Sequence, residues 1–120
     1  MRFILSFLLV MTVIPALKAQ TPASATNTTP AGNAQNGKKI FSNYGCYQCH
    51  GFEAQGGAGA RLAPRPIAFT AFSKYLRQPT GEMPPYTSKV VSDKELADIY
   101  AFLQSIPPPP AANSIPLLSK

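Results

Sequence analysis

The sequence has few of the side chains from which metal sites and acid–base centres are usually built. Its 120 residues include two cysteines, one histidine and five acidic residues. A structural zinc ion needs four ligands, so two Cys and one His would leave it under-ligated unless carboxylates joined them. A single His without a neighbouring acid–base cluster also argues against an enzyme or sensor that works on a substrate at an open site.

The apolar run near the start of the chain is too short to span a bilayer. It covers residues 3–14, whereas a membrane-spanning helix needs about 20 residues. Arg2 before the run and Ala19 after it predict an export signal over residues 1–19, and export indicates a bacterial periplasm. Because Leu17 is not an ideal residue near the cleavage point, an uncleaved anchor with membrane association stays open as the alternative.

The charge is modestly positive. The formal net charge is +6, from 11 basic and 5 acidic residues. Removing residues 1–19 deletes Arg2 and Lys18, and the remaining nine basic and five acidic residues give +4. This charge is too small and dispersed to predict nucleic-acid binding, although it permits steering toward an acidic partner surface.

Composition divides the rest of the chain into three segments. Residues 20–35 contain no large apolar side chain and predict a flexible linker. Residues 36–106 carry helical patterns and predict one small domain. Residues 107–120 open with four prolines, which end the preceding helix and favour polyproline II. This proline-rich C-terminal tail either frays or lies as a strap on a partner subunit.

Three helices are predicted within residues 36–106. The first begins at Asn36 as its N-cap and has an apolar stripe, and Gly37 near its start indicates the close approach of another helix. The second covers residues 69–76 and ends before Pro79. A capping box formed by Ser92 and Glu95 opens the last helix, whose broad apolar face should pack on the first.

Cys46-Tyr47-Gln48-Cys49-His50 is the segment that carries the chemistry. Two thiols three positions apart, followed at once by an imidazole, form the attachment pattern of c-type haem. On one helical turn Cys46 and Cys49 share a face, so both sulfurs can add to the vinyl groups of one porphyrin. His50 would then bind the iron through one ring nitrogen, while the other N–H donates to a carbonyl.

Three other interpretations of the two cysteines compete with haem attachment. A thiol–disulfide redox centre normally opens a helix in a βαβ-type domain, and the flanking sequence shows neither strands nor crossovers. A zinc site needs four ligands, and two cysteines and one histidine supply three. A structural disulfide leaves the adjacent His50 unexplained.

Met83 is the predicted second axial ligand of the iron. It is the one methionine left after residues 1–19 are removed, and Pro84 and Pro85 stiffen its loop. A lone methionine usually fills a core, but a haem protein that still needs a ligand favours the thioether. Arg61 and Arg65 could meet the haem propionates, with simple exposure as the alternative.

Over about residues 36–106 the chain resembles the class I c-type cytochromes, which are small monohaem electron carriers. The matching elements are Gly37 and Phe41, the segment from Cys46 to His50, Leu62, Met83 in GEMPPY, and ELADIYAFL in the last helix.

The resemblance implies an all-α cytochrome c fold, with three to four short helices around one covalently bound haem c and its iron. The first and last helices would cross, with Gly37 and Phe41 facing Ile99 and Phe102. His50 and Met83 would be the axial pair. The family often has proline where this chain has Ala60, whose carbonyl would accept the hydrogen bond from His50.

The function expected from this resemblance is electron transfer, with no catalytic residues. The protein would carry single electrons between a dehydrogenase or respiratory complex and an acceptor, and RQPTGEMPPY is similar to small cytochromes that accompany dehydrogenases. Its partners would be redox proteins, with no stable membrane insertion after signal cleavage. The alternatives are a five-coordinate haem that binds a gas or reacts with peroxide, and a thiol–disulfide protein without haem.

Overall fold

A computed structural model of the protein describes residues 29–117. The predicted export signal, and most of the predicted linker, lie outside the described residues. The elements are α1 (Ala34–Asn43), α2 (Tyr47–His50), α3 (Phe69–Arg77), α4 (Asp93–Ser105) and a short 3₁₀ helix, η1 (Ala112–Ser114). No strand occurs between residues 29 and 117, and the predicted all-α class is confirmed for this part of the chain.

The predicted N-cap of α1 is wrong by three residues. Asn33, not Asn36, is the cap, and its side chain accepts a hydrogen bond from the backbone N–H of Asn36 at 2.9 Å. The side chain of Asn36 instead donates to Asp98 of α4 at 2.8 Å. Both asparagines suit a cap, and a contact 62 residues away decides between them.

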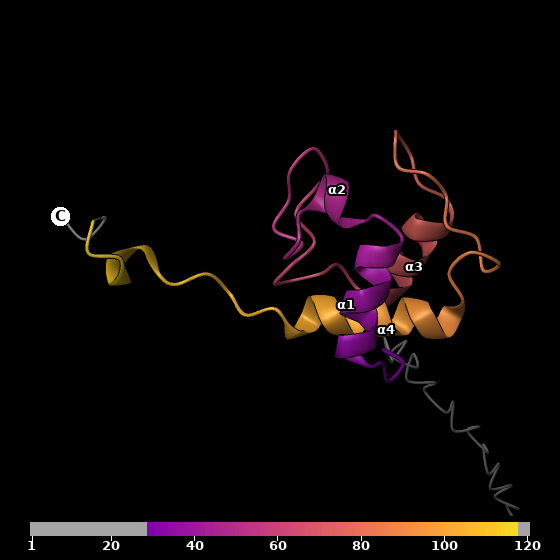
Figure 1. Cartoon of the computed structure of the whole chain (residues 1–120), viewed down its shortest axis with the longest axis horizontal. Coiled ribbons are helices and arrows are strands. Elements are labelled where there is room, and N and C mark those ends of the chain that lie inside the picture. The colour runs from indigo at the N-terminus through magenta and orange to yellow at the C-terminus, as the bar shows by residue number, and fades with distance from the viewer. Residues whose placement is uncertain (1–28, 118–120) are drawn as a thin grey trace, which may run out of the picture.

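Helix α1 lies across α4 at close contact, as Figure 1 shows. Gly37 is buried at the crossing, where a Cβ atom would overlap the backbone carbonyl of Asp98. One turn further on, the rings of Phe41 and Phe102 pack with their centroids 5.5 Å apart. The predicted helix crossing, with a glycine at the point of closest approach, is confirmed.

We expect Gly37→Ala to lower the free energy of unfolding by about 2 kcal/mol, because an added methyl group forces α1 and α4 apart. Denaturant unfolding followed by circular dichroism measures this loss. Gln35→Ala on the exposed side of the same helix is the matched control and should leave stability almost unchanged. Equal stabilities for the two variants would contradict the close crossing.

The core lies where α3 meets the α1–α4 pair. The ring of Tyr100 packs on Phe69 and Phe72 of α3, with centroids 5.2 and 5.4 Å apart. Its buried hydroxyl donates to the carbonyl of Ile67 at 2.9 Å, so the polar end of the ring is satisfied. The other buried apolar residues are Ile40, Phe41, Ala54, Ala63, Leu76, Val91, Leu96, Ala97, Ile99, Phe102 and Leu103.

Both boundaries of the loop between α3 and α4 follow local signals. Helix α3 runs one residue beyond the predicted end, to Arg77. The capping box of α4 is confirmed: Ser92 Oγ accepts from the N–H of Glu95 at 3.3 Å, and the Glu95 carboxylate accepts from the N–H of Ser92 at 2.8 Å. Hydrogen bonds to its carboxylate from the N–H and the hydroxyl of Ser92 lower the pKa of Glu95. The loop that contains Met83 is therefore bounded by two well-defined helix ends.

After α4 the chain leaves the helices and runs outward through the prolines to η1, as Figure 1 shows. Leu117, near the end of the described chain, is 85% exposed. A docked position of this tail on a partner stays a prediction.

Candidate functional site

The two cysteines and the histidine lie on one short helix. Cys46 is the N-cap of α2 and is half-buried, whereas Cys49 lies within α2 and is exposed. Both thiols are free. His50 is the last residue of α2, and the chain then turns at Gly51, whose φ is +78°. The predicted attachment segment is thus one helical turn that presents two thiols and an imidazole.

The ring of His50 is oriented by the loop that follows it. Its Nδ1 atom lies 2.7 Å from the carbonyl oxygen of Ala60. A carbonyl can only accept, so Nδ1 carries the proton and donates, which leaves the lone pair of Nε2 free to bind a metal. This is the contact that the resemblance to class I cytochromes implied, and it forms with alanine at position 60.

The backbone of the same loop packs directly on the motif. The N–H of Gly59 donates to the carbonyl of Cys49 at 2.8 Å, and the N–H of Gly56 donates to that of His50 at 2.8 Å. A Cβ atom on Gly59 would lie 2.9 Å from Cε1 of His50 and 3.2 Å from Cβ of Cys49. Only glycine fits there. Gly59 was not among the site residues predicted from the sequence.

Met83 lies in the loop between α3 and α4 and is half-buried against the core. Upstream of it, the hydroxyl of Tyr75 donates to the carbonyl of Thr80 at 2.9 Å. Downstream, the N–H of Tyr86 donates to the carbonyl of Leu76 at 3.0 Å. The loop is therefore held to α3 on both sides of Met83.

Tyr86 connects the methionine loop to the cysteine motif. Its hydroxyl donates to the carbonyl of Tyr44 at 3.2 Å, just before Cys46. Burial raises the pKa of the Cys46 thiol, and the backbone at Cys46 and the neighbouring Tyr86 hydroxyl partly oppose that rise. Burial and the neighbouring Cys46 both raise the pKa of Tyr86. The structure thus brings together two segments that are 42 residues apart in the sequence, through the hydrogen bond between Tyr86 and Tyr44.

The two arginines of the 61–65 segment are exposed. Arg61 donates through Nε to the carbonyl of Gln55 at 3.2 Å, and this contact holds its own loop. A contact of Arg61 or Arg65 with propionates stays a prediction. Leu62 is half-buried and packs on the core, where its N–H donates to Ala54 at 2.9 Å.

The donor set fits a covalently attached haem. Two free thiols, an imidazole with one nitrogen available and a half-buried thioether supply the attachment points and axial ligands that such a group needs. Half-buried apolar side chains that pack against the core would suit a flat apolar ring; they include Tyr47, Leu62, Phe69 and Tyr86. Between residues 29 and 117 no group of three or more His, Cys, Asp or Glu side chains gathers that could hold a metal ion by itself.

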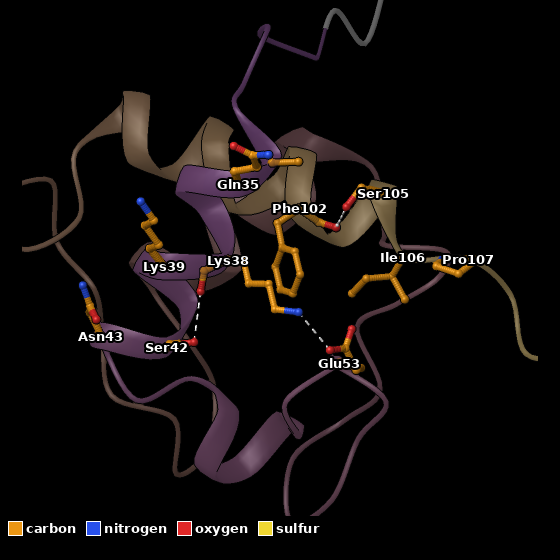
Figure 2. A pocket seen from close by; sticks show the side chains of 11 residues that line it. Gln35, Lys38, Lys39, Ser42, Asn43, Glu53, Phe102, Ser105, Ile106 and Pro107 are labelled. Carbon is orange, nitrogen blue, oxygen red and sulfur yellow. Dashed lines mark hydrogen bonds and ion pairs between the residues drawn. The ribbon is translucent and has the colours of Figure 1, made fainter.

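A separate hollow of about 740 Å³ lies between α1 and the end of α4 (Figure 2). Lys38 reaches past the ring of Phe102 to Glu53, with its Nζ 3.0 Å from Oε1. Both charged side chains are more than half exposed, so this ion pair contributes little to stability. None of the four predicted site residues lines the hollow.

An all-α fold with crossed terminal helices and a Cys46–His50 segment braced by Ala60 defines a c-type cytochrome domain. The family model for cytochrome c oxidase, cbb3-type, subunit III matches residues 32–103, and the chain belongs to this family. No curated protein and no solved structure matches the chain.

Family membership establishes haem-based electron transfer as the general function, with covalently bound haem c and its iron as the cofactor. The spacing of Cys46 and Cys49, which allows both sulfurs to form thioether bonds to one porphyrin, agrees with this cofactor. In the part of the chain that the structure describes, none of the helices has the length and apolar character needed to cross a membrane.

Proposed function

We propose that the protein is a periplasmic one-electron carrier with a single haem c. Cys46 and Cys49 attach the porphyrin, and His50 and Met83 bind the iron. The carrier shuttles electrons between a dehydrogenase or respiratory complex and an acceptor. The haem supplies the redox chemistry by cycling its iron between ferrous and ferric states.

The observation that carries this proposal is the contact between His50 and Ala60. A 2.7 Å hydrogen bond from Nδ1–H fixes both the tautomer and the direction of the ring. The His50 ring held in this way does not reorient when the iron gains or loses an electron. This contact supports His50 as an axial ligand, because such a ligand needs a fixed ring orientation.

Met83 supports a carrier rather than a substrate-binding haem. Its loop is held to α3 and, through Tyr86, to the segment before Cys46. A thioether favours the ferrous state, and a site of low dielectric constant disfavours the extra ferric charge, so both effects raise the reduction potential. With two axial ligands in place, the iron has no open coordination position at which a substrate could bind.

Electrons would leave through an exposed edge of the haem at the contact with the partner. A modest positive charge favours acidic partner surfaces, and a weak, short-lived contact suits a carrier. The periplasmic location follows from the predicted export signal, and the C-terminal tail is a candidate contact with a partner subunit.

An absorption spectrum of the exported protein, oxidised and then reduced with dithionite, tests the proposal. We expect sharp low-spin bands in both states, and a haem that stays with the protein under denaturing conditions in alkaline pyridine. Strong binding of carbon monoxide to the ferrous protein at neutral pH would instead indicate a five-coordinate haem. A colourless protein with two titratable thiols would overturn the proposal in favour of thiol–disulfide chemistry.

A further inference from the structure

Arg77 forms the densest set of hydrogen bonds around the methionine loop. Its Nη1 atom donates to the carbonyl of Tyr86 at 2.8 Å and to that of Val91 at 2.6 Å. Its Nη2 atom donates to the carboxylate of Asp93 at 2.6 Å. The Arg77 side chain is only 19% exposed, whereas that of Asp93 is 87% exposed. Most of this interaction is therefore with the shielded backbone of the loop.

These three contacts join the end of α3, the methionine loop and the start of α4. Arg77 is the last residue of α3, Tyr86 follows the Met83-Pro84-Pro85 segment, and Asp93 is the first residue of α4. A planar guanidinium can serve several acceptors at fixed angles, which a lysine ammonium cannot do as well. The two prolines stiffen the connection between the clamped carbonyl of Tyr86 and Met83.

We propose that Arg77 is a positioning residue for Met83: it holds the loop closed, so that the thioether stays on the iron. This inference rests on the proposed His50–Met83 ligation. Hydrogen bonds from a charged donor are stronger than neutral ones, so losing two to backbone carbonyls markedly raises the population of the open loop.

Added imidazole measures the population of the open loop, because it binds ferric iron only when the Met83 thioether is not bound to the iron. The apparent dissociation constant equals the intrinsic constant divided by the open fraction, so a tenfold larger open fraction gives a tenfold tighter complex. The titration uses the exported ferric protein with its haem attached. The long-wavelength charge-transfer band of ferric thioether-ligated haem provides a second readout.

For Arg77→Met we expect imidazole to bind about tenfold more tightly and the charge-transfer band to weaken. Arg77→Lys keeps the charge but not the fork of donors, and should show a smaller increase. The matched control is Lys74→Met, which removes one positive charge from an exposed position on the same helix and should behave as the wild type. Wild-type affinity in Arg77→Met would overturn the inference.

Met83→Ala separates the two proposals. If Met83 is the ligand, this variant binds imidazole most tightly, and adding Arg77→Met causes no further change. An equal gain from Arg77→Met with and without Met83 would show general loosening and overturn the positioning role. Wild-type affinity in Met83→Ala would overturn the ligation itself. Should Arg77→Met yield no folded haem protein, Arg77→Lys decides alone: tighter binding supports the role, and wild-type affinity overturns it.

Discussion

Met83→Ala is expected to turn a six-coordinate low-spin haem into a high-spin or water-ligated one and to lower the reduction potential. The thioether is a soft ligand that stabilises ferrous iron, and water in its place favours the ferric state. Axial ligands can move haem potentials over about 0.8 V, so we expect a fall on the order of 0.2 V. Absorption spectra and redox titration measure the two effects.

The fold should survive this change, because the loop keeps its hydrogen bonds on both sides of Met83. Helix content measured by circular dichroism is therefore the internal control. Glu82→Ala, at the exposed neighbouring position, should leave spectrum and potential unchanged. An unaltered spectrum in Met83→Ala would remove Met83 from the iron and from the proposed function.

Asp98→Ala is expected to cause the largest loss of stability, about 3 kcal/mol in the free energy of unfolding. Asp98 is 1% exposed in the middle of α4. Its carboxylate accepts from the N–H of Asn33 at 2.7 Å, the amide of Asn36 at 2.8 Å and Nζ of Lys94 at 3.1 Å. Truncation leaves the donors of α1 without their acceptor at the crossing that carries the fold.

The same residue predicts a pH dependence. Hydrogen bonds from Asn33 and Asn36 lower the pKa of Asp98, with Lys94 adding to the effect, although burial opposes it. A carboxyl whose pKa is lower in the folded state contributes stability above its unfolded value, near pH 4, and loses that contribution as pH falls through the folded value. The gap in stability between wild type and Asp98→Asn should therefore narrow below pH 4.

Denaturant unfolding of the exported haem protein at pH 7 and at pH 3 measures both effects. Glu53→Gln is the control, since the exposed Lys38–Glu53 pair should contribute less than about 1 kcal/mol at either pH. If Asp98→Ala unfolds like the Glu53→Gln control, the carboxylate does not hold α1 to α4.

Local signals predicted the boundaries of α3 and α4 within a residue, because Pro79 and the capping box of Ser92 and Glu95 act over one helical turn. The start of α1 could not be read in this way, since Asn33 and Asn36 are equally good caps and the choice depends on Asp98. The Asp98 carboxylate on the apolar face of α4 was the available signal for that contact, but the contact was not predicted from it.

The candidate site shows the same difference between local signals and contacts that depend on the folded structure. The sequence predicted the attachment segment and Met83, because the chemistry requires particular side chains at a particular spacing. The role of Ala60 came from the resemblance to class I cytochromes, since any residue has a carbonyl. Arg77 and Gly59 had no sequence signal as site residues, because Arg77 works on backbone carbonyls and Gly59 works by having no side chain.

By itself, then, the sequence determined the helical segments and the attachment motif, because helical periodicity, caps and the spacing of Cys46, Cys49 and His50 are local properties of the chain. The tertiary structure decided how the motif is braced by Ala60, how Arg77 holds the methionine loop and how Asp98 joins the crossed helices. Each of these depends on hydrogen bonds between different segments of the chain, and only folding brings such groups within about 3 Å of one another.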